Sequence, residues 1–490
     1  MSMPLLSLIV FLPLLGGLVI LFVPKRQDRA VRSIATAALV LTFLASLMAL
    51  SQFTPGAGYQ LTETHAWIPA VRIHYALGVD GISIVLVVLT TLLSLLACLA
   101  SYNIAVRVKE YFVLYLLLVT GMLGTFLALD LFLFYVFWEI VLVPMYFLIG
   151  IWGGPRKEYA AIKFFLYTLA GSVLMLLSIL FLYLNAHTFS IPELAGGAGS
   201  MLPLKIQQIL FLGFFLAFAI KVPMFPFHTW LPDAHVEAPT PISVLLAGVL
   251  LKMGGYGFLR IAFPFLPQGA ASFAVPLAIL AVISIVYGAL CAMAQTDFKK
   301  LVAYSSVSHM GFVMLGLSAF TQTGFNGALL QMFNHGIITG ALFLLVGVLY
   351  ERTHTRDLTA FGGLGVKVPV YAGLLILFGL GSLGLPGLSG FVGEFLCLLG
   401  AFPVHRVLTI VSVLGIVLAA GYILLTVQKV LLGPLNTKWK DLADVNLFEI
   451  ATLAPLVILT VLLGIWPALV LNIQAPTLNK LVEQLTRLTG

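Results

Sequence analysis

Long apolar stretches, separated by short polar connections, occupy almost the whole of the chain. Crossing the roughly 30 Å hydrocarbon layer of a membrane takes about 20 helical residues, and each stretch is about that long. The pattern predicts an all-α polytopic membrane protein with about 14 transmembrane helices. The stretches lie near residues 4–23, 31–52, 81–104, 111–129, 131–152, 162–185, 206–235, 240–262, 273–294, 301–319, 326–350, 370–397, 407–433 and 448–472.

The connections between these stretches are short, with one exception. Residues 52–83 are rich in Gly, Pro, Thr and aromatic residues, and we expect them to form an ordered lid or a small hairpin outside the membrane. No linker or shift of composition divides the chain, so a single membrane domain over residues 1–490 is predicted. Residues 1–24 carry neither a basic n-region nor a small-residue cleavage site, which predicts a retained first helix.

Two of the apolar stretches are interrupted by proline. Lys221 precedes Pro223 and Pro226 in the seventh, and a glycine-rich segment containing Pro386 precedes Glu394 in the twelfth. Such breaks free backbone polar groups to meet water or ions. Each broken stretch is the fourth of five, and the two groups of five cross the membrane in opposite senses. This pattern is typical of inverted repeats in ion transporters. The predicted repeats, each with a discontinuous helix, span about residues 111–262 and 273–433, flanked by helices within residues 1–104 and 448–472.

Composition and charge agree with a membrane protein. Hydrophobic residues make up 61% of the chain and charged residues 9%, with a mean hydropathy of +1.12, which excludes a water-soluble globule. Sixteen Lys and Arg residues lie on one side of the predicted topology and six on the other, which places both termini outside the cytoplasm. Because these residues are dispersed over short loops, the net charge of +7 reflects topology, and no nucleic-acid binding is expected.

Several common chemistries are excluded by the same pattern. Cys98, Cys291 and Cys397 lie far apart within apolar stretches and lack CxxC spacing, so neither a zinc site nor an iron–sulfur cluster is expected in this chain. Glycines at residues 379–384 match a dinucleotide-binding spacing. That fingerprint requires a strand before it and a helix after it, whereas these glycines lie within a membrane stretch. We expect neither a metal nor a nucleotide here.

Two ionisable residues at membrane depth suggest a functional pair. An ionisable group in hydrocarbon costs roughly 2.5 to 3.5 kcal/mol on the most lenient scale, so it normally has a partner. Glu139 lies near the middle of the fifth stretch and Lys221 near the first break. The simplest interpretation is that they are partners. Two alternatives remain open: Glu139 as a protonated structural carboxyl, and Lys221 as a helix-end lysine that snorkels to the headgroups.

Four more ionisable residues lie in later stretches. Lys252 lies about eight residues, or roughly 12 Å of helix, from Arg260, which makes snorkeling unfavourable. His309 and His335 have serine, Asn and Gln neighbours that can hold water, although each could also be a packing residue. Glu394 follows the second break, and its alternative is a helix-end carboxylate at the interface. The candidate proton-translocating residues are Glu139, Lys221, Lys252, His309, His335 and Glu394.

Five motifs in the chain resemble those of the antiporter-like membrane subunits of respiratory complex I, and most closely the subunit M (chain 4) type. The resemblance covers nearly the whole chain. Its most specific part is Lys221-Val-Pro-Met-Phe-Pro-Phe-His-Thr-Trp-Leu-Pro-Asp-Ala-His235. The other motifs lie at residues 77–83, 137–146, 238–243 and 387–394.

The resemblance implies roles for the candidate residues. Glu139 and Lys221 correspond to a pair that modulates proton affinity. Lys252, with His309 and His335, corresponds to groups that line a central water axis. We therefore expect proton translocation without a redox centre in this chain.

Glu394 corresponds to the residue that gates proton exit in this family. In the L and N subunits, and in Mrp-type sodium/proton antiporters, the matching broken helix usually bears lysine. Subunit L also carries a long lateral C-terminal helix, whereas about 18 residues follow the last apolar stretch here. Both differences favour subunit M. An Mrp-type antiporter subunit and a module of a membrane-bound hydrogenase remain the alternatives.

The resemblance also implies partners and a location. NADH, FMN, iron–sulfur clusters and quinone are expected in partner subunits, where quinone reduction drives translocation. The expected partners are L-like and N-like antiporter-like subunits, the peripheral redox arm and the lipid bilayer. The expected location is the bacterial cell inner membrane, as a multi-pass protein.

Overall fold

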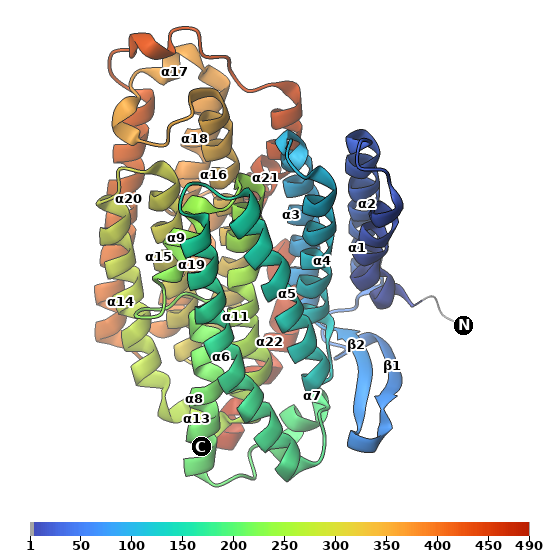
Figure 1. Cartoon of the computed structure of the whole chain (residues 1–490). Helices are drawn as coiled ribbons and strands as arrows, with labels where there is room; N and C mark the ends of the chain where they lie inside the picture. The colour runs from blue at the N-terminus through green and yellow to red at the C-terminus, as the bar shows by residue number, and fades with distance from the viewer. Residues whose placement is uncertain (1–3, 490) are drawn as a thin grey trace. The chain divides into compact units, whose positions relative to one another are not determined.

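The computed structural model describes residues 4–489 and is mainly helical (Figure 1). Thirteen helices in these residues are long and apolar enough to cross a membrane. A pair of shorter apolar helices, α18 (Pro369–Ser382) and α19 (Ser389–Ala401), accounts for the remaining predicted stretch. The predicted all-α polytopic architecture is therefore confirmed. The long helices are α1 (Leu5–Phe22), α2 (Asp28–Gln52), α3 (Ser83–Ala100), α4 (Val108–Leu127), α5 (Leu131–Trp152), α6 (Lys157–Ala186), α8 (Leu204–Lys221), the composite Thr240–Phe265, α14 (Ala274–Met293), α15 (Phe298–Ser318), α16 (Gln322–Thr353), α20 (Arg406–Leu431) and α21 (Leu447–Ile465).

The chain divides into two compact units, each described by itself. Unit 1 comprises the chain up to Val222, Val249–Ala274 and the residues from Asn472 onward. It contains α1 to α8 and the two strands β1 (Gln60–Ile68) and β2 (Ile73–Val79), which pair antiparallel with Thr64 opposite Ala76. The small hairpin expected within residues 52–83 is therefore present (Figure 1).

The start of α5 shows how the sequence positions the first candidate site. The carboxylate of Asp130 accepts hydrogen bonds from the backbone N–H groups of Phe132 and Leu133, which have no partner within the helix. Gly124 of α4 faces the ring of Phe137, and a Cβ at Gly124 would overlap that ring. This cap and this close packing set the position of α5, which carries Glu139 two turns after its start.

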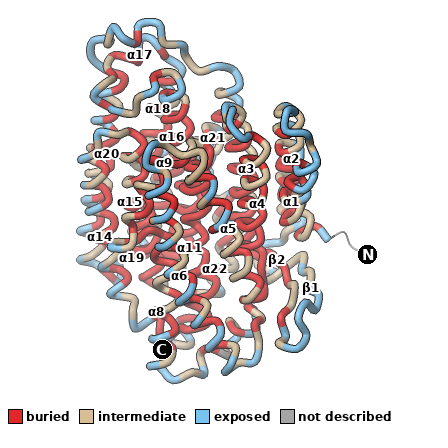
Figure 2. The backbone as a smooth tube through the Cα atoms, in the orientation of Figure 1, coloured by how far each residue is buried: buried red, intermediate tan, exposed pale blue. Residues whose placement is uncertain are grey.

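Unit 2 comprises Pro223–Gly248 and Val275–Leu471. Within it α15 and α16 are almost entirely buried, and α16 packs closely against α19. By contrast, α14, α20 and α21 expose one apolar face, with Val407 and Ile465 among the most exposed side chains (Figure 2). Exposed apolar side chains on helices of membrane length are the surface that lipid covers.

Both predicted helix breaks are present. The helix α8 ends at Lys221, and helical structure resumes at Trp230, where the short α9 (Trp230–Glu237) begins. The second break lies between Ser382 and Ser389. Within it, Gly384 and Gly387 have φ angles of +81° and +93°, which residues with a Cβ rarely adopt.

The C-terminal region differs from the prediction. The last helix that is both long and apolar enough to cross a membrane ends at Ile465, before the predicted residue 472, and a further helix, α22 (Ala468–Thr489), follows it. The sequence pattern missed α22 because its polar residues and Pro476 interrupt the apolar run. The single-domain organisation and the inverted repeats stay predictions.

Candidate functional site

In unit 1, Lys221 is the last residue of α8 and its side chain is only 2% exposed. Its ammonium group lies 5.2 Å from the ring centroid of Trp138 and 5.8 Å from that of Phe164. At this distance an aromatic face attracts a cation. Glu139 is close enough to act on Lys221 electrostatically. The snorkeling alternative is therefore wrong, and Lys221 lies beside the turn of α5 that carries Glu139. The pairing of Glu139 with Lys221 stays a prediction.

Glu139 has an incomplete set of hydrogen bonds. One of its carboxylate oxygens is buried and has no hydrogen-bond partner. Tyr135 lies four residues earlier on α5, which places its side chain on the same helix face as Glu139. A carboxylate oxygen with a vacant acceptor site can receive a proton or a water.

Lys252 is fully buried in the composite helix Thr240–Phe265. Two π-helical turns, Leu246–Leu250 and Phe258–Ala262, lie on either side of its segment α11 (Leu251–Gly257), and π-turns are frequent at functional sites. This segment packs on α8, where a Cβ at Gly254 would lie 2.7 Å from the carbonyl oxygen of Phe218. The glycine therefore lets the helix that carries Lys252 approach the helix that ends at Lys221.

In unit 2, Glu394 and His309 form a short contact. The Nδ1 atom of His309 lies 2.6 Å from Oε1 of Glu394, and Gln331 donates to the same oxygen at 3.0 Å. On the other side of the ring, Nε2 lies 3.1 Å from the Ser382 hydroxyl and 3.4 Å from the Tyr422 hydroxyl. Gln331, Ser382 and Tyr422 are therefore positioning residues that sequence reasoning had not assigned.

His335 completes this second group. Its ring centroid is 5.8 Å from that of His309, and both rings line a small cavity of about 10 Å³, close to the space that one water needs. Glu394 also lines the cavity and is only 3% exposed. Glu394 is therefore enclosed by protein, and the alternative of a carboxylate at the membrane interface stays open.

The six candidate residues fall into two groups, one in each unit. Glu139, Lys221 and Lys252 belong to unit 1, and His309, His335 and Glu394 belong to unit 2. Each group joins acids, bases and hydroxyls in a buried setting, which suits proton exchange. A continuous path through all six residues stays a prediction.

Two charges that the topology assigned to loops are buried instead. Arg260 is 5% exposed and forms an ion pair with Asp80 at 2.5 Å. Lys299, near the start of α15, donates a hydrogen bond to the carbonyl of Ala238 and lies near Glu237. One feature of the sequence could have indicated that Arg260 is buried in an ion pair: Asp80, an acidic residue within the predicted outer segment.

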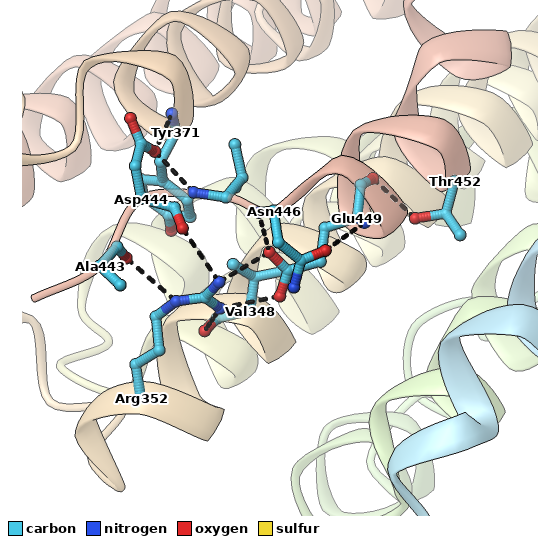
Figure 3. Close-up of polar contacts among 9 residues, drawn as sticks. Val348, Arg352, Tyr371, Ala443, Asp444, Asn446, Glu449 and Thr452 are labelled. Atoms are coloured by element: carbon cyan, nitrogen blue, oxygen red, sulfur yellow. Dashed lines mark hydrogen bonds and ion pairs between the residues drawn. The ribbon is translucent and has the colours of Figure 1, made fainter.

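Another ionic group of unit 2 is fully connected (Figure 3). Arg352 donates to both carboxylate oxygens of Glu449, at 2.8 and 2.7 Å, and to the carbonyls of Ala443 and Asp444. The carboxylate of Asp444 accepts from the backbone N–H of Tyr371. Its complete bonding and short distances make this group a structural clamp between α16 and the segment that leads into α21.

Comparison with known proteins identifies the family. The family described as NADH:quinone oxidoreductase/Mrp antiporter, TM, matches residues 128–419, a range that contains all six candidate residues. The NADH-quinone oxidoreductase subunit M of Rhodobacter capsulatus is 48% identical to this chain, over 98% of this chain and 96% of the relative. The chain belongs to the subunit M family.

Solved structures agree with this assignment. A chain of respiratory complex I from Thermus thermophilus with bound NADH matches with a TM-score of 0.89 and 34% identity, covering 98% of this chain and 100% of the other. A chain of the Mrp complex from Dietzia sp. DQ12-45-1b matches with a TM-score of 0.87 and 22% identity, covering both chains completely. At that identity, the Mrp complex shares the fold alone with this member of the subunit M family.

Proposed function

We propose that this chain is a proton-translocating membrane subunit of an NADH:quinone oxidoreductase. The name of the Rhodobacter capsulatus relative and the complex I structure support this assignment. Quinone reduction in partner subunits supplies the driving force, and this chain moves protons in response. NADH, FMN, iron–sulfur clusters and quinone are held by those partners.

The observation that carries the proposal is the burial of Lys221 beside Glu139. Burial disfavours the charged form of a lysine, whereas a nearby carboxylate favours it. A small movement of Glu139 toward or away from Lys221 therefore changes the proton affinity of the lysine. The vacant acceptor site on Glu139 and the aromatic surroundings of Lys221 are consistent with a pair whose charge state changes during turnover.

The other four residues carry the proton onward. Lys252 takes the proton from the region of Lys221, and His309 and His335 pass it toward Glu394. Glu394 can take up a proton from His309 and return it, because the two side chains are in direct contact. The cavity beside them can hold one water, which lets His335 join the same exchange.

The setting follows from the family. We propose that the protein lies in a bacterial inner membrane with both termini on the non-cytoplasmic side. It assembles there with L-like and N-like subunits and connects through them to the peripheral redox arm. The two broken helices then belong to inverted repeats at about residues 111–262 and 273–433.

The test uses the intact complex in proteoliposomes, with Lys221→Met compared with Lys429→Met. Lys429 is an exposed lysine near the end of α20, so its substitution removes one charge away from the site. NADH-driven proton uptake per electron is expected to fall in Lys221→Met and to stay normal in Lys429→Met. Normal uptake in an assembled Lys221→Met complex would refute the proposal. Proton uptake that is driven by a sodium gradient, and not by NADH oxidation, would favour the Mrp-type antiporter alternative.

A further inference from the structure

A second polar cluster of unit 1 surrounds Arg260. Its Nη2 lies 2.5 Å from Asp80, its Nη1 donates to the Tyr59 hydroxyl at 2.8 Å, and its Nε donates to the Tyr256 hydroxyl at 3.1 Å. The guanidinium also lies 5.2 Å from the ring centroid of Tyr59 and 5.3 Å from that of Tyr256. Arg260 is thus held by three side chains through all three of its nitrogens.

A cavity of about 160 Å³ adjoins this cluster. This volume is large enough for several waters. The cavity lies beside the segment that links the hairpin to α3, and we call it the hairpin-side cavity. Its polar lining includes Tyr59, Asp80, Arg260, Lys480 and Gln484.

The cluster lies on the same helix as Lys252. Lys252, Tyr256 and Arg260 are spaced by four residues, which places them along one side of the composite helix. The rise from Lys252 to Arg260 is roughly 12 Å. Tyr256 lies between them and is buried. Along this side of the helix, Tyr256 and Arg260 therefore lie between Lys252 and the hairpin-side cavity.

The hydrogen bonds of this cluster cannot pass a proton. The Tyr256 hydroxyl donates to the backbone carbonyl of Phe126 at 3.0 Å and accepts from Arg260. A peptide carbonyl does not pass a proton on, and an arginine in a protein does not lose one. Tyr59 also accepts from Arg260, so each hydroxyl that meets Arg260 faces a donor that keeps its proton.

The two members outside the membrane helices also keep their protonation states. Burial alone would raise the pKa of Asp80, but Arg260 and hydrogen bonds from Ser83 and Ile82 outweigh it and hold the pKa below its usual value. Burial raises the pKa of Tyr59. At neutral pH, Asp80 therefore stays a carboxylate and Tyr59 a neutral phenol.

We propose that Arg260, held by Asp80, Tyr59 and Tyr256, is a proton barrier between Lys252 and the hairpin-side cavity. The guanidinium keeps its protons, and the surrounding hydrogen bonds leave no chain along which a proton can transfer. Translocation through Lys252 needs such a barrier, since a second open route would dissipate the gradient. The inference rests on the proposed role of Lys252.

The test replaces the Asp80–Arg260 ion pair by neutral side chains, with the double variant Asp80→Asn/Arg260→Gln in the intact complex. A glutamine cannot make all three hydrogen bonds of Arg260, which leaves the hydroxyls of Tyr59 and Tyr256 open to water. Lys480→Gln, which removes a charge from the rim of the same cavity, is the matched control. Passive proton leak is measured in proteoliposomes without NADH after a pH jump. We expect the leak to rise about tenfold in the double variant, the factor for about 1.4 kcal/mol of barrier, and to stay unchanged in the control.

An assembled double variant with a normal leak would overturn the barrier, and the cluster would then only anchor the hairpin and α22. If the variant does not assemble, hydroxyl-radical footprinting of the unmodified complex decides. Tyr59 is expected to be oxidised and Tyr256 to be protected, and equal oxidation of both would overturn the proposal. Because the leak needs no turnover, a leak-tight double variant beside a non-pumping Lys221→Met complex refutes the barrier and leaves the proposed function standing.

Discussion

Two carboxylates within the apolar stretches, the half-buried Glu139 in unit 1 and the buried Glu394 in unit 2, have opposite surroundings. Glu139 lies on the membrane helix α5, and one of its two carboxylate oxygens has no hydrogen-bond partner. Glu394 is held at one oxygen by His309 at 2.6 Å and by Gln331 at 3.0 Å. A carboxylate with few hydrogen bonds depends on a neighbouring charge for its stability, whereas one with several donors has its charge state set locally.

This difference separates a switch from a terminal site. Because Glu139 lacks local donors, its charge and that of Lys221 depend on each other, and a small displacement changes both. Glu394 is coupled to His309 by direct contact and to Ser382 and Tyr422 through the ring, so displacement changes it less. We infer that the Glu139 pair responds to events elsewhere and that the Glu394 group passes the proton on.

The largest effect is expected for Glu139→Gln. The amide is similar in shape but removes the charge that favours protonated Lys221, and one pKa unit corresponds to about tenfold in proton affinity. The proton affinity of Lys221 is therefore expected to fall by about tenfold or more. Proton uptake per electron is expected to fall with it while the complex still assembles. Stopped-flow uptake with a pH dye checks this, with Glu110→Gln, a partly exposed acid near the start of α4, as the control. Normal uptake would mean that the pair is not the switch.

A smaller effect is expected for Glu394→Gln. The amide can still bond to His309 and Gln331 but no longer takes up a proton, so His309 must pass the proton to water in the adjoining cavity. We expect a loss of about fivefold in rate, or about 1 kcal/mol. Translocation rates at several pH values check this, because a relay change shifts the pH profile and a packing change does not. A loss as large as that of Glu139→Gln, with an unshifted pH profile, would contradict the distinction drawn between the two carboxylates.

The membrane helices could be predicted because their signal is local. A run of about 20 apolar residues predicts a span by length alone, and the prolines near Lys221 predict a break in the same way. The burial of Arg260 could not be predicted in this way, because it depends on Asp80, which is distant along the chain. Arg260 lies at the end of an apolar stretch, where a charged residue usually belongs to a loop. The burial of Lys299 was missed for the same reason.

The site was predicted in part for related reasons. Glu139, Lys221 and Lys252 stand out as ionisable residues in apolar stretches. Because an unpaired charge in hydrocarbon costs free energy, the sequence predicts that Glu139 and Lys221 are partners. Ser382, Tyr422 and other uncharged groups do not stand out. Hydroxyls and amides are common in membrane helices, and only the packing of distant helices shows which of them point at an ionisable group.

The clamp of Figure 3 provides a control for stability without function. Arg352→Ala is expected to lower the free energy of unfolding by about 2 to 3 kcal/mol, since a charged group loses several hydrogen bonds at once. Proton uptake per electron in the assembled complex should stay unchanged. Thermal dissociation measured beside proteoliposome uptake checks both. A changed stoichiometry would place Arg352 in the proton path.

The smallest effect is expected for acid stability at Asp80. Its pKa is lowered in the folded protein, because Arg260 and backbone donors outweigh burial. Its contribution to stability is therefore present above the unfolded value of about 4 and is lost as pH falls through the folded pKa. Asp80→Asn should lower Tm at neutral pH, and the difference in Tm from the unmodified protein should narrow below about pH 4. A difference in Tm that stays constant with pH would show that this carboxylate does not titrate.

The most direct test of the switch is a double-mutant cycle on proton uptake per electron. It compares Glu139→Gln, Lys221→Met and the double variant with the unmodified complex, all at equal rates of NADH oxidation. Two groups that act as one unit lose their function together, so the double variant should be no worse than the more damaging single variant. Losses that multiply would show that Glu139 and Lys221 act independently, and would contradict the switch.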